Sequence, residues 1–64
     1  MIGYVARDKT GELYLYNDLP IYDEKYGGWF ASPDMINITG YFPEFDDLHH
    51  TNDPVKVEIN IKIV

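Results

Sequence analysis

Two adjacent histidines, His49 and His50, lie among the carboxylates of Asp46, Asp47 and Asp53. Imidazole nitrogens and carboxylate oxygens are ligands for zinc and other divalent metals. Successive side chains of a strand point in opposite directions, so both rings can reach one ion only from a loop. The sequence has no cysteine and no other histidine to complete such a site. We therefore interpret the segment as a solvated loop, predict no cofactor, and keep His49 and His50 as the only metal candidates.

Other patterns associated with catalysis are incomplete. The adjacent acids Asp23-Glu24 and Asp46-Asp47 diverge from each other, and nothing around them predicts an apolar pocket that would raise one pKa for acid–base chemistry. Ser32-Pro33-Asp34 is typical of a helix cap or a turn rather than of a nucleophile elbow. Gly27-Gly28 lacks the Lys and Ser/Thr of a phosphate-binding loop. We predict that the protein is not an enzyme.

The tyrosines are the more informative side chains. Six Tyr, three Phe and one Trp make 16% of the chain aromatic. Tyr4, Tyr14 and Tyr16 fall on one face of a predicted hairpin, and tyrosine is enriched at protein interfaces. The same residues are also suited to the rim of a thin core, with their hydroxyl groups in water. Both interpretations stay open, and Tyr4, Tyr14 and Tyr16 are the candidate binding residues.

The hairpin is predicted from residues 2–7 and 12–17. Asp8 favours the start of a type I turn, and Gly11 can adopt the left-handed conformation that closes a three-residue loop with a bulge. The resulting register pairs Arg7 with Leu13 and Tyr4 with Tyr16. The face opposite the tyrosines is aliphatic, so we expect the hairpin to be covered on one side and at least half covered on the other.

Short extended segments follow the hairpin. We expect a strand at 21–22, a loop at 23–28, a strand at 29–30 that aims Trp29 inward, and a strand at 35–39. A helical turn over Pro33–Ile36 is the alternative to the last of these, because Ser before Pro resembles a helix start. Residues 41–45 read as an edge or turn with Phe42 and Phe45 tucked in, and residues 46–54 as a surface loop.

Within the last ten residues, 55–64, apolar and polar side chains alternate as far as Ile63, and Val64 adds one more apolar residue. This period of two, with β-branched apolar residues, is typical of a strand that is half buried. We therefore predict one all-β domain over residues 1–64, built as a four- to five-stranded twisted antiparallel sheet or a partly open SH3-like barrel. An α+β fold with one helical turn near Pro33–Ile36 is the alternative. A chain this short has only about 3–5 kcal/mol of stability.

The net charge is −6, from eleven acidic and five basic residues. Phosphate binding needs a basic patch, so we expect no direct nucleic-acid ligand and no anionic membrane surface. No stretch approaches the ~20 apolar residues of a membrane-spanning helix. The absence of cysteine and of a basic, apolar leader predicts a cytoplasmic protein.

Several short motifs together resemble short uncharacterised reading frames of bacterial genomes and their phages or mobile elements. They cover nearly the whole chain and are Tyr4–Asp8, Leu13–Tyr16, Pro20, Gly28-Trp29, Phe42–Glu44 and Pro54–Val57. The resemblance implies a small cytoplasmic protein and carries over no site residue.

Our functional prediction is a small adaptor-type module that binds another protein through its aromatic face. Two alternatives remain open. An acidic polyanion mimic would inhibit a nucleic-acid-binding protein through its carboxylates, and a structural homo-oligomer would associate through an exposed strand edge.

Overall fold

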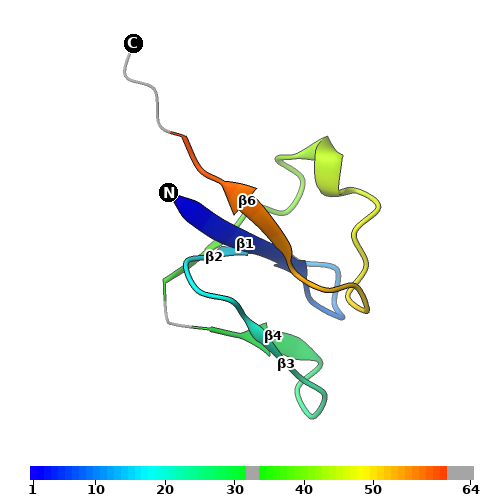
Figure 1. Cartoon of the computed structure of the whole chain (residues 1–64). Coiled ribbons are helices and arrows are strands. Elements are labelled where there is room, and N and C mark those ends of the chain that lie inside the picture. Colours follow the sequence, from blue (N-terminus) through cyan, green and yellow to red (C-terminus); the bar gives the residue numbers. More distant parts are fainter. Residues whose placement is uncertain (32–33, 61–64) are drawn as a thin grey trace.

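The computed structural model describes residues 1–31 and 34–60. These residues form six strands and one 3₁₀ helix: β1 (Ile2–Arg7), β2 (Leu13–Tyr16), β3 (Ile21–Asp23), β4 (Gly28–Phe30), β5 (Met35–Asn37), η1 (Pro43–Phe45) and β6 (Val55–Glu58). The strands make a four-stranded sheet in the order β5-β2-β1-β6 and a two-stranded ribbon, β3-β4 (Figure 1). The all-β prediction is confirmed. Over the described residues the strands do not close into a barrel, and they divide into two sheets rather than one.

The β1–β2 hairpin has the predicted register. Tyr4 pairs with Tyr16 and Arg7 with Leu13. The Gly11 N–H donates to the Asp8 carbonyl oxygen at 2.9 Å, and Gly11 has a φ of 95°, a value that L side chains rarely adopt. The turn chemistry alone therefore set the alignment of the two central strands.

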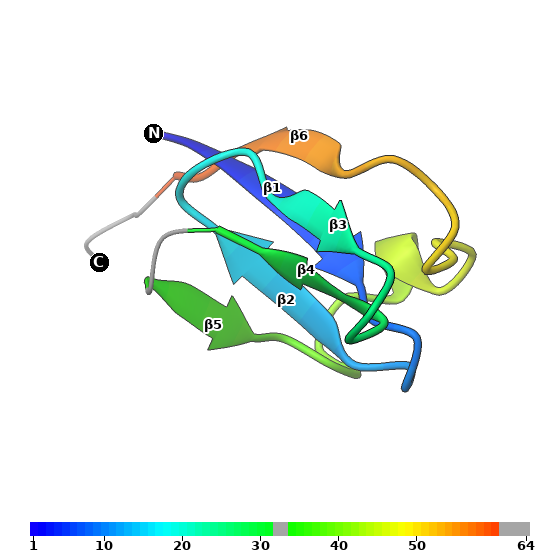
Figure 2. The same ribbon diagram turned by 90° about the horizontal axis from the view of Figure 1, so that it is seen from below.

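Both edges of the sheet are formed by segments from later in the chain. β6 pairs antiparallel with β1, and β5 pairs antiparallel with β2 (Figure 2). The predicted terminal strand is observed over Val55–Glu58, and the Ile59 N–H extends the pairing by donating to the Met1 carbonyl at 2.7 Å. Residues 61–64 of that prediction lie outside the described residues.

The α+β alternative is wrong for the residues that can be compared. Met35 and Ile36 belong to β5, where the predicted helical turn would have ended. Ser32 and Pro33 lie outside the described residues. Ile-Asn-Ile-Thr contains three β-branched residues, which lose side-chain freedom in a helix and are accommodated in a strand.

The core lies on one face of the four-stranded sheet. Val5, Leu13 and Ile38 form its buried centre, and partly buried residues pack around them: Leu15, Phe45, Leu48 and Val57. η1 brings Phe45 onto this core, whereas Phe42 stays 45% exposed. The expectation that both phenylalanines are tucked in therefore holds for Phe45 only. Leu48, the apolar exception in the predicted 46–54 loop, anchors that loop to the sheet.

The β3–β4 ribbon covers the other face of the sheet (Figures 1 and 2). Trp29 points inward, as predicted, and it holds the ribbon there because the indole Nε1–H donates to the Arg7 carbonyl at 2.9 Å. The Trp29 backbone N–H donates to Asp8 Oδ1 at 3.2 Å. Ala6 and Tyr16, on this face, are almost completely buried. The central hairpin is thus covered on both sides. None of the described helices is long and apolar enough to cross a membrane.

Candidate protein-binding surface

The three candidate tyrosines share one face of the hairpin, but they are not equally accessible. Tyr4 and Tyr14 are half-buried, whereas Tyr16 is only 1% exposed. The Tyr16 hydroxyl lies 3.5 Å from the Trp29 carbonyl oxygen, beneath the β3–β4 ribbon. Tyr16 is therefore a core residue in this structure, and of the two interpretations left open for the tyrosines its burial favours the core. The aromatic cluster is covered at this end by a segment that the hairpin pattern could not reveal.

The environments of Tyr14 and Tyr16 hold both phenols in the protonated form. The pKa of Tyr16 is raised to about 12, mainly by burial. The negative charge of Asp8 and the electrostatic interaction with Tyr14 act in the same direction. A hydrogen bond from the Tyr14 hydroxyl to Glu12 Oε2, 2.6 Å long, is the main reason that the pKa of Tyr14 is also raised. Neither phenol is prepared for proton transfer near neutral pH.

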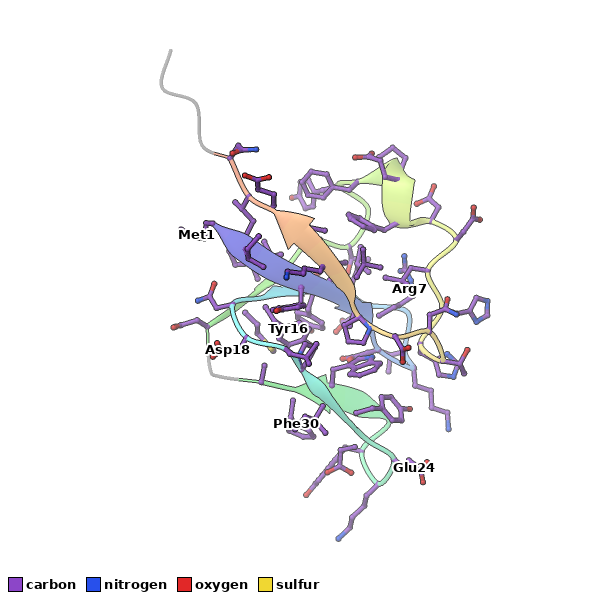
Figure 3. All side chains as sticks on the ribbon, in the orientation of Figure 1. Met1, Arg7, Tyr16, Asp18, Glu24 and Phe30 are labelled. Carbon is purple, nitrogen blue, oxygen red and sulfur yellow. The ribbon has the colours of Figure 1, made fainter. Side chains whose placement is uncertain are left out.

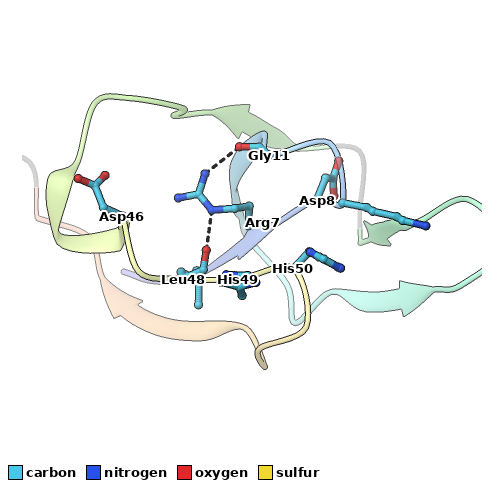
Figure 4. Close-up of a pocket in the computed structure, with 8 residues that line it drawn as sticks. Arg7, Asp8, Gly11, Asp46, Leu48, His49 and His50 are labelled. Atoms are coloured by element: carbon cyan, nitrogen blue, oxygen red, sulfur yellow. Dashed lines mark hydrogen bonds between the residues drawn. The ribbon is translucent and has the colours of Figure 1, made fainter.

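The candidate metal residues lie beside a depression formed by the β1–β2 turn and the 46–50 segment (Figure 4). The ring centroids of His49 and His50 are 6.0 Å apart, and Asp46 lies on the far side of Arg7 from His50. Within residues 1–31 and 34–60, no three His, Cys, Asp or Glu side chains are grouped closely enough to hold a metal ion. The depression therefore offers no coordination shell around the two histidines.

Arg7 occupies the middle of this depression and has a structural function. Its guanidinium donates to the Leu48 carbonyl at 2.6 Å, the Gly11 carbonyl at 2.7 Å and the Phe45 carbonyl at 2.9 Å. The planar fork of five N–H donors can satisfy several carbonyl oxygens at once, which a lysine ammonium cannot do in the same geometry. Arg7 thus fixes η1 and the following loop to the central strand.

One exposed apolar surface lies on the β3–β4 ribbon. Because Ile21 pairs with Phe30 and Tyr22 with Trp29, the strand alternation sends one pair to each side. Tyr22 and Trp29 meet edge to face, with ring centroids 5.0 Å apart, and Trp29 contacts the sheet. Ile21 and Phe30 therefore lie on the outer face of the ribbon.

The outer face also includes Tyr26, whose ring meets that of Phe30 edge to face at 5.7 Å between centroids. Ile21 is 75% exposed, Tyr26 74% and Phe30 52%. In Figure 3, Phe30 lies on the side of the ribbon that points away from the four-stranded sheet, whereas Tyr16 lies between the two. We call Ile21, Tyr26 and Phe30 the outer patch. Contiguous apolar side chains of this size at a surface are typical of interaction sites.

Two acidic side chains lie at the end of the ribbon that carries Tyr26. Asp23 shares the strand of Ile21, and Glu24 follows it at the tip of the ribbon (Figure 3). Lys25 is the single base in this turn, and its backbone N–H donates to Asp23 Oδ1 at 2.9 Å. An apolar centre with an acidic rim is suited to a partner surface that carries apolar and basic groups.

The two strands of the β3–β4 ribbon lie where the sequence predicts extended segments, but their pairing with each other was not predicted. The strands at 21–22 and 29–30 were expected separately, with a loop between them. The missed signal is Gly27, which has a φ of 69° and whose N–H donates to the Asp23 carbonyl at 2.9 Å. A glycine at the end of a short loop between two β-prone runs is a hairpin signal. A hairpin alignment would have placed Ile21 and Phe30 on one face and Tyr22 and Trp29 on the other.

Comparison with known proteins gives no match to a family model, to a curated protein sequence or to a solved structure.

Proposed function

We propose that this protein is a protein-binding module and that the outer patch of the β3–β4 ribbon is its docking surface. The partner is another protein that presents an apolar contact surface flanked by lysine or arginine. The aromatic character of the sequence-based proposal is retained, and its location moves from the β1–β2 hairpin to the next hairpin along the chain.

One observation supports this proposal above all. Ile21, Tyr26 and Phe30 are largely solvent-exposed in a small domain that has few buried hydrophobic residues among its described positions. Fully burying an aliphatic or aromatic side chain of this size contributes about 1.5–3 kcal/mol. A domain with little stability to spare would gain from placing these residues in its core, so their exposure favours a function at the surface.

The physical character of the surroundings supports a partner of opposite charge. The chain carries a net charge of −6, and acidic residues border the outer patch. Complementary charge increases the association rate and selects among partners more than it adds to affinity.

The absence of cysteine from the sequence fits a protein that works in the reducing cytoplasm, which is the location we propose.

The test compares two variants that remove exposed side chains from different places. Ile21→Ser with Phe30→Ser disrupts the outer patch, and Tyr41→Ser removes an exposed aromatic side chain outside the patch. Each tagged protein is used to capture partners from a native lysate, and the captured proteins are identified and quantified. We expect a specific partner to bind the wild type and Tyr41→Ser and to be lost from the double variant.

Other results would overturn the proposal. Capture that is equal for the wild type and the double variant would exclude the outer patch. If the partner is captured equally by the wild type and the double variant and is lost from both at about 0.5 M salt, the result would support the polyanion mimic instead. Light scattering that shows a dimer of the wild type and a monomer of the double variant would assign the patch to self-association.

A further inference from the structure

A second apolar surface lies on the opposite face of the four-stranded sheet. A groove runs between η1 and strand β6, and its apolar walls include Phe42, Phe45, Leu15, Val57 and Ile59. Phe42 and Phe45 meet edge to face with ring centroids 6.5 Å apart, and Phe42 remains 45% exposed. The groove floor reaches Val5 and Ile38 of the core, so a side chain entering it would contact the most buried part of the domain.

The polar groups at this groove carry one sign of charge. Glu44 of η1 and Glu58 of β6 line it, and Asn60 adds a neutral amide. None of the lining residues in the described part of the chain is Lys or Arg. Glu44 comes from η1 and Glu58 from β6, so acidic residues line the groove from two different elements. Acidic groups around an apolar channel select against acidic partners and for basic ones.

We infer that this groove binds a basic amphipathic segment of another protein. Its apolar side chains would enter between Phe42 and Ile59, and its lysine or arginine side chains would reach Glu44 and Glu58. This is the groove mode of peptide recognition, in which periodic apolar anchors provide the contact area and the flanking charges fix the orientation.

The groove is separate from the outer patch. η1 and the β3–β4 ribbon lie on opposite faces of the sheet (Figure 1), and no residue belongs to both surfaces. One molecule can therefore hold two partners at once, one on each face of the sheet. The groove would bind its segment whether or not the outer patch has a partner, so the two proposals fail independently.

The test uses a synthetic probe of known chemistry. A fluorescent helical peptide of about 15 residues carries leucines on one face and lysines on the other, and a matched peptide carries glutamate in place of lysine. Fluorescence anisotropy measures affinity for the full chain. We expect Phe42→Ser to weaken binding of the lysine peptide at least about tenfold and Phe30→Ser to leave it unchanged, although the two phenylalanines have similar exposure. The glutamate peptide should not bind.

Charge variants separate the groove from the general attraction of an acidic protein for a basic peptide. Glu44→Gln with Glu58→Gln is compared with Asp18→Asn with Glu24→Gln, which changes the net charge equally away from the groove. We expect only the first pair to weaken binding several-fold, and chemical shift changes in NMR spectra to concentrate at Leu15, Val57 and Ile59.

Three results would overturn the inference. Equal weakening by both charge pairs would show that net charge alone attracts the peptide. Shift changes centred on Ile21 and Phe30 would place the peptide on the outer patch. Binding that occurs only after deletion of residues 61–64 would assign the groove to the chain's own last residues.

Discussion

Replacing Arg7 by methionine should destabilise the whole domain, although the Arg7 side chain is only half-buried and is not part of the apolar core. Methionine keeps the apolar stem of the side chain and removes the guanidinium. The Leu48 carbonyl oxygen then loses its 2.6 Å hydrogen bond from Arg7, and the Phe45 carbonyl oxygen loses one of 2.9 Å but keeps the bond from the Leu48 N–H at 3.0 Å. These two carbonyls belong to η1 and the loop that cover one side of the core.

The expected magnitude follows from the kind of bond. A hydrogen bond with a charged partner contributes about 1.5–3 kcal/mol, and water can replace part of it at a loop carbonyl. The exposed bond to the Gly11 carbonyl adds little. We expect Arg7→Met to lower the free energy of unfolding by about 2–3 kcal/mol, out of a total of about 3–5 kcal/mol for a domain of this size.

The assay is urea denaturation followed by Trp29 fluorescence. Trp29 is the only tryptophan, and its indole N–H donates to the Arg7 backbone carbonyl, so it reports on the centre of the structure. With a denaturant slope near 1 kcal/mol/M, the midpoint should fall by roughly 2–3 M. Arg7→Lys should recover about half of the loss, because an ammonium group cannot bridge three carbonyls that surround a planar fork.

Lys25→Met is the matched control. It removes a positive charge from the tip of the ribbon, and we expect a change within about 0.5 kcal/mol, as for most surface substitutions. If Arg7→Met and Lys25→Met shift the midpoint equally, the loss comes from net charge and the role assigned to the three carbonyls is refuted. Full recovery by Arg7→Lys would refute the argument from the planar fork.

Three further changes test other contacts. Burial raises the pKa of Tyr16 to about 12, above the unfolded value near 10, so the folded chain retains a proton that the unfolded chain releases. Stability should therefore fall between pH 10 and 12 by roughly 1–2 kcal/mol. In a pH series of urea melts, Tyr16→Phe should remove most of this alkaline step and leave the part due to Tyr14, whose pKa is also raised; an unchanged step would show that Tyr16 is not its source. Gly3→Ala places a Cβ only 2.7 Å from Ile59 Cδ1, so we expect a loss of about 1–3 kcal/mol in thermal unfolding, and an unchanged melting temperature would show that Ile59 moves freely. Thr39→Val removes the Oγ1 acceptor that lies 2.8 Å from the Leu13 N–H; we expect a cost of about 1–2 kcal/mol and faster hydrogen exchange of that amide, and unchanged exchange would contradict the assignment.

The parts of the fold that the sequence predicted are those that depend on local chemistry. Asp8 and Gly11 set the β1–β2 turn, and the turn fixed the register of every pair in that hairpin. The alternation from Val55 predicted β6 because a half-buried strand has a period of two. Neither inference requires knowledge of which distant segments meet.

The candidate site depended on such distant contacts, and there the sequence was insufficient. The β1–β2 hairpin has two apolar faces, and its own residues do not indicate which face the rest of the chain covers. Tyr16 is buried because Trp29 reaches Arg7 across 22 positions of the sequence and brings the ribbon over it. No local pattern encodes that docking. The exposure of Phe30 follows from the same event, since covering Tyr16 with one side of the ribbon leaves the other side in water.

The order of strands in the sheet, β5-β2-β1-β6, has a consequence for synthesis on the ribosome. The two central strands leave the exit tunnel before the strands that flank them, and their short loop lets them pair early, because closing a short loop costs little entropy. The free side of β1 must then wait for Val55–Glu58, whose pairing closes a loop of about 50 residues. During this interval the nascent chain presents an unpaired strand edge beside an incomplete core, the kind of surface that associates with other chains. We expect the pairing of Val55–Glu58 with β1 to complete the sheet and to end the period in which the nascent chain is most prone to aggregate.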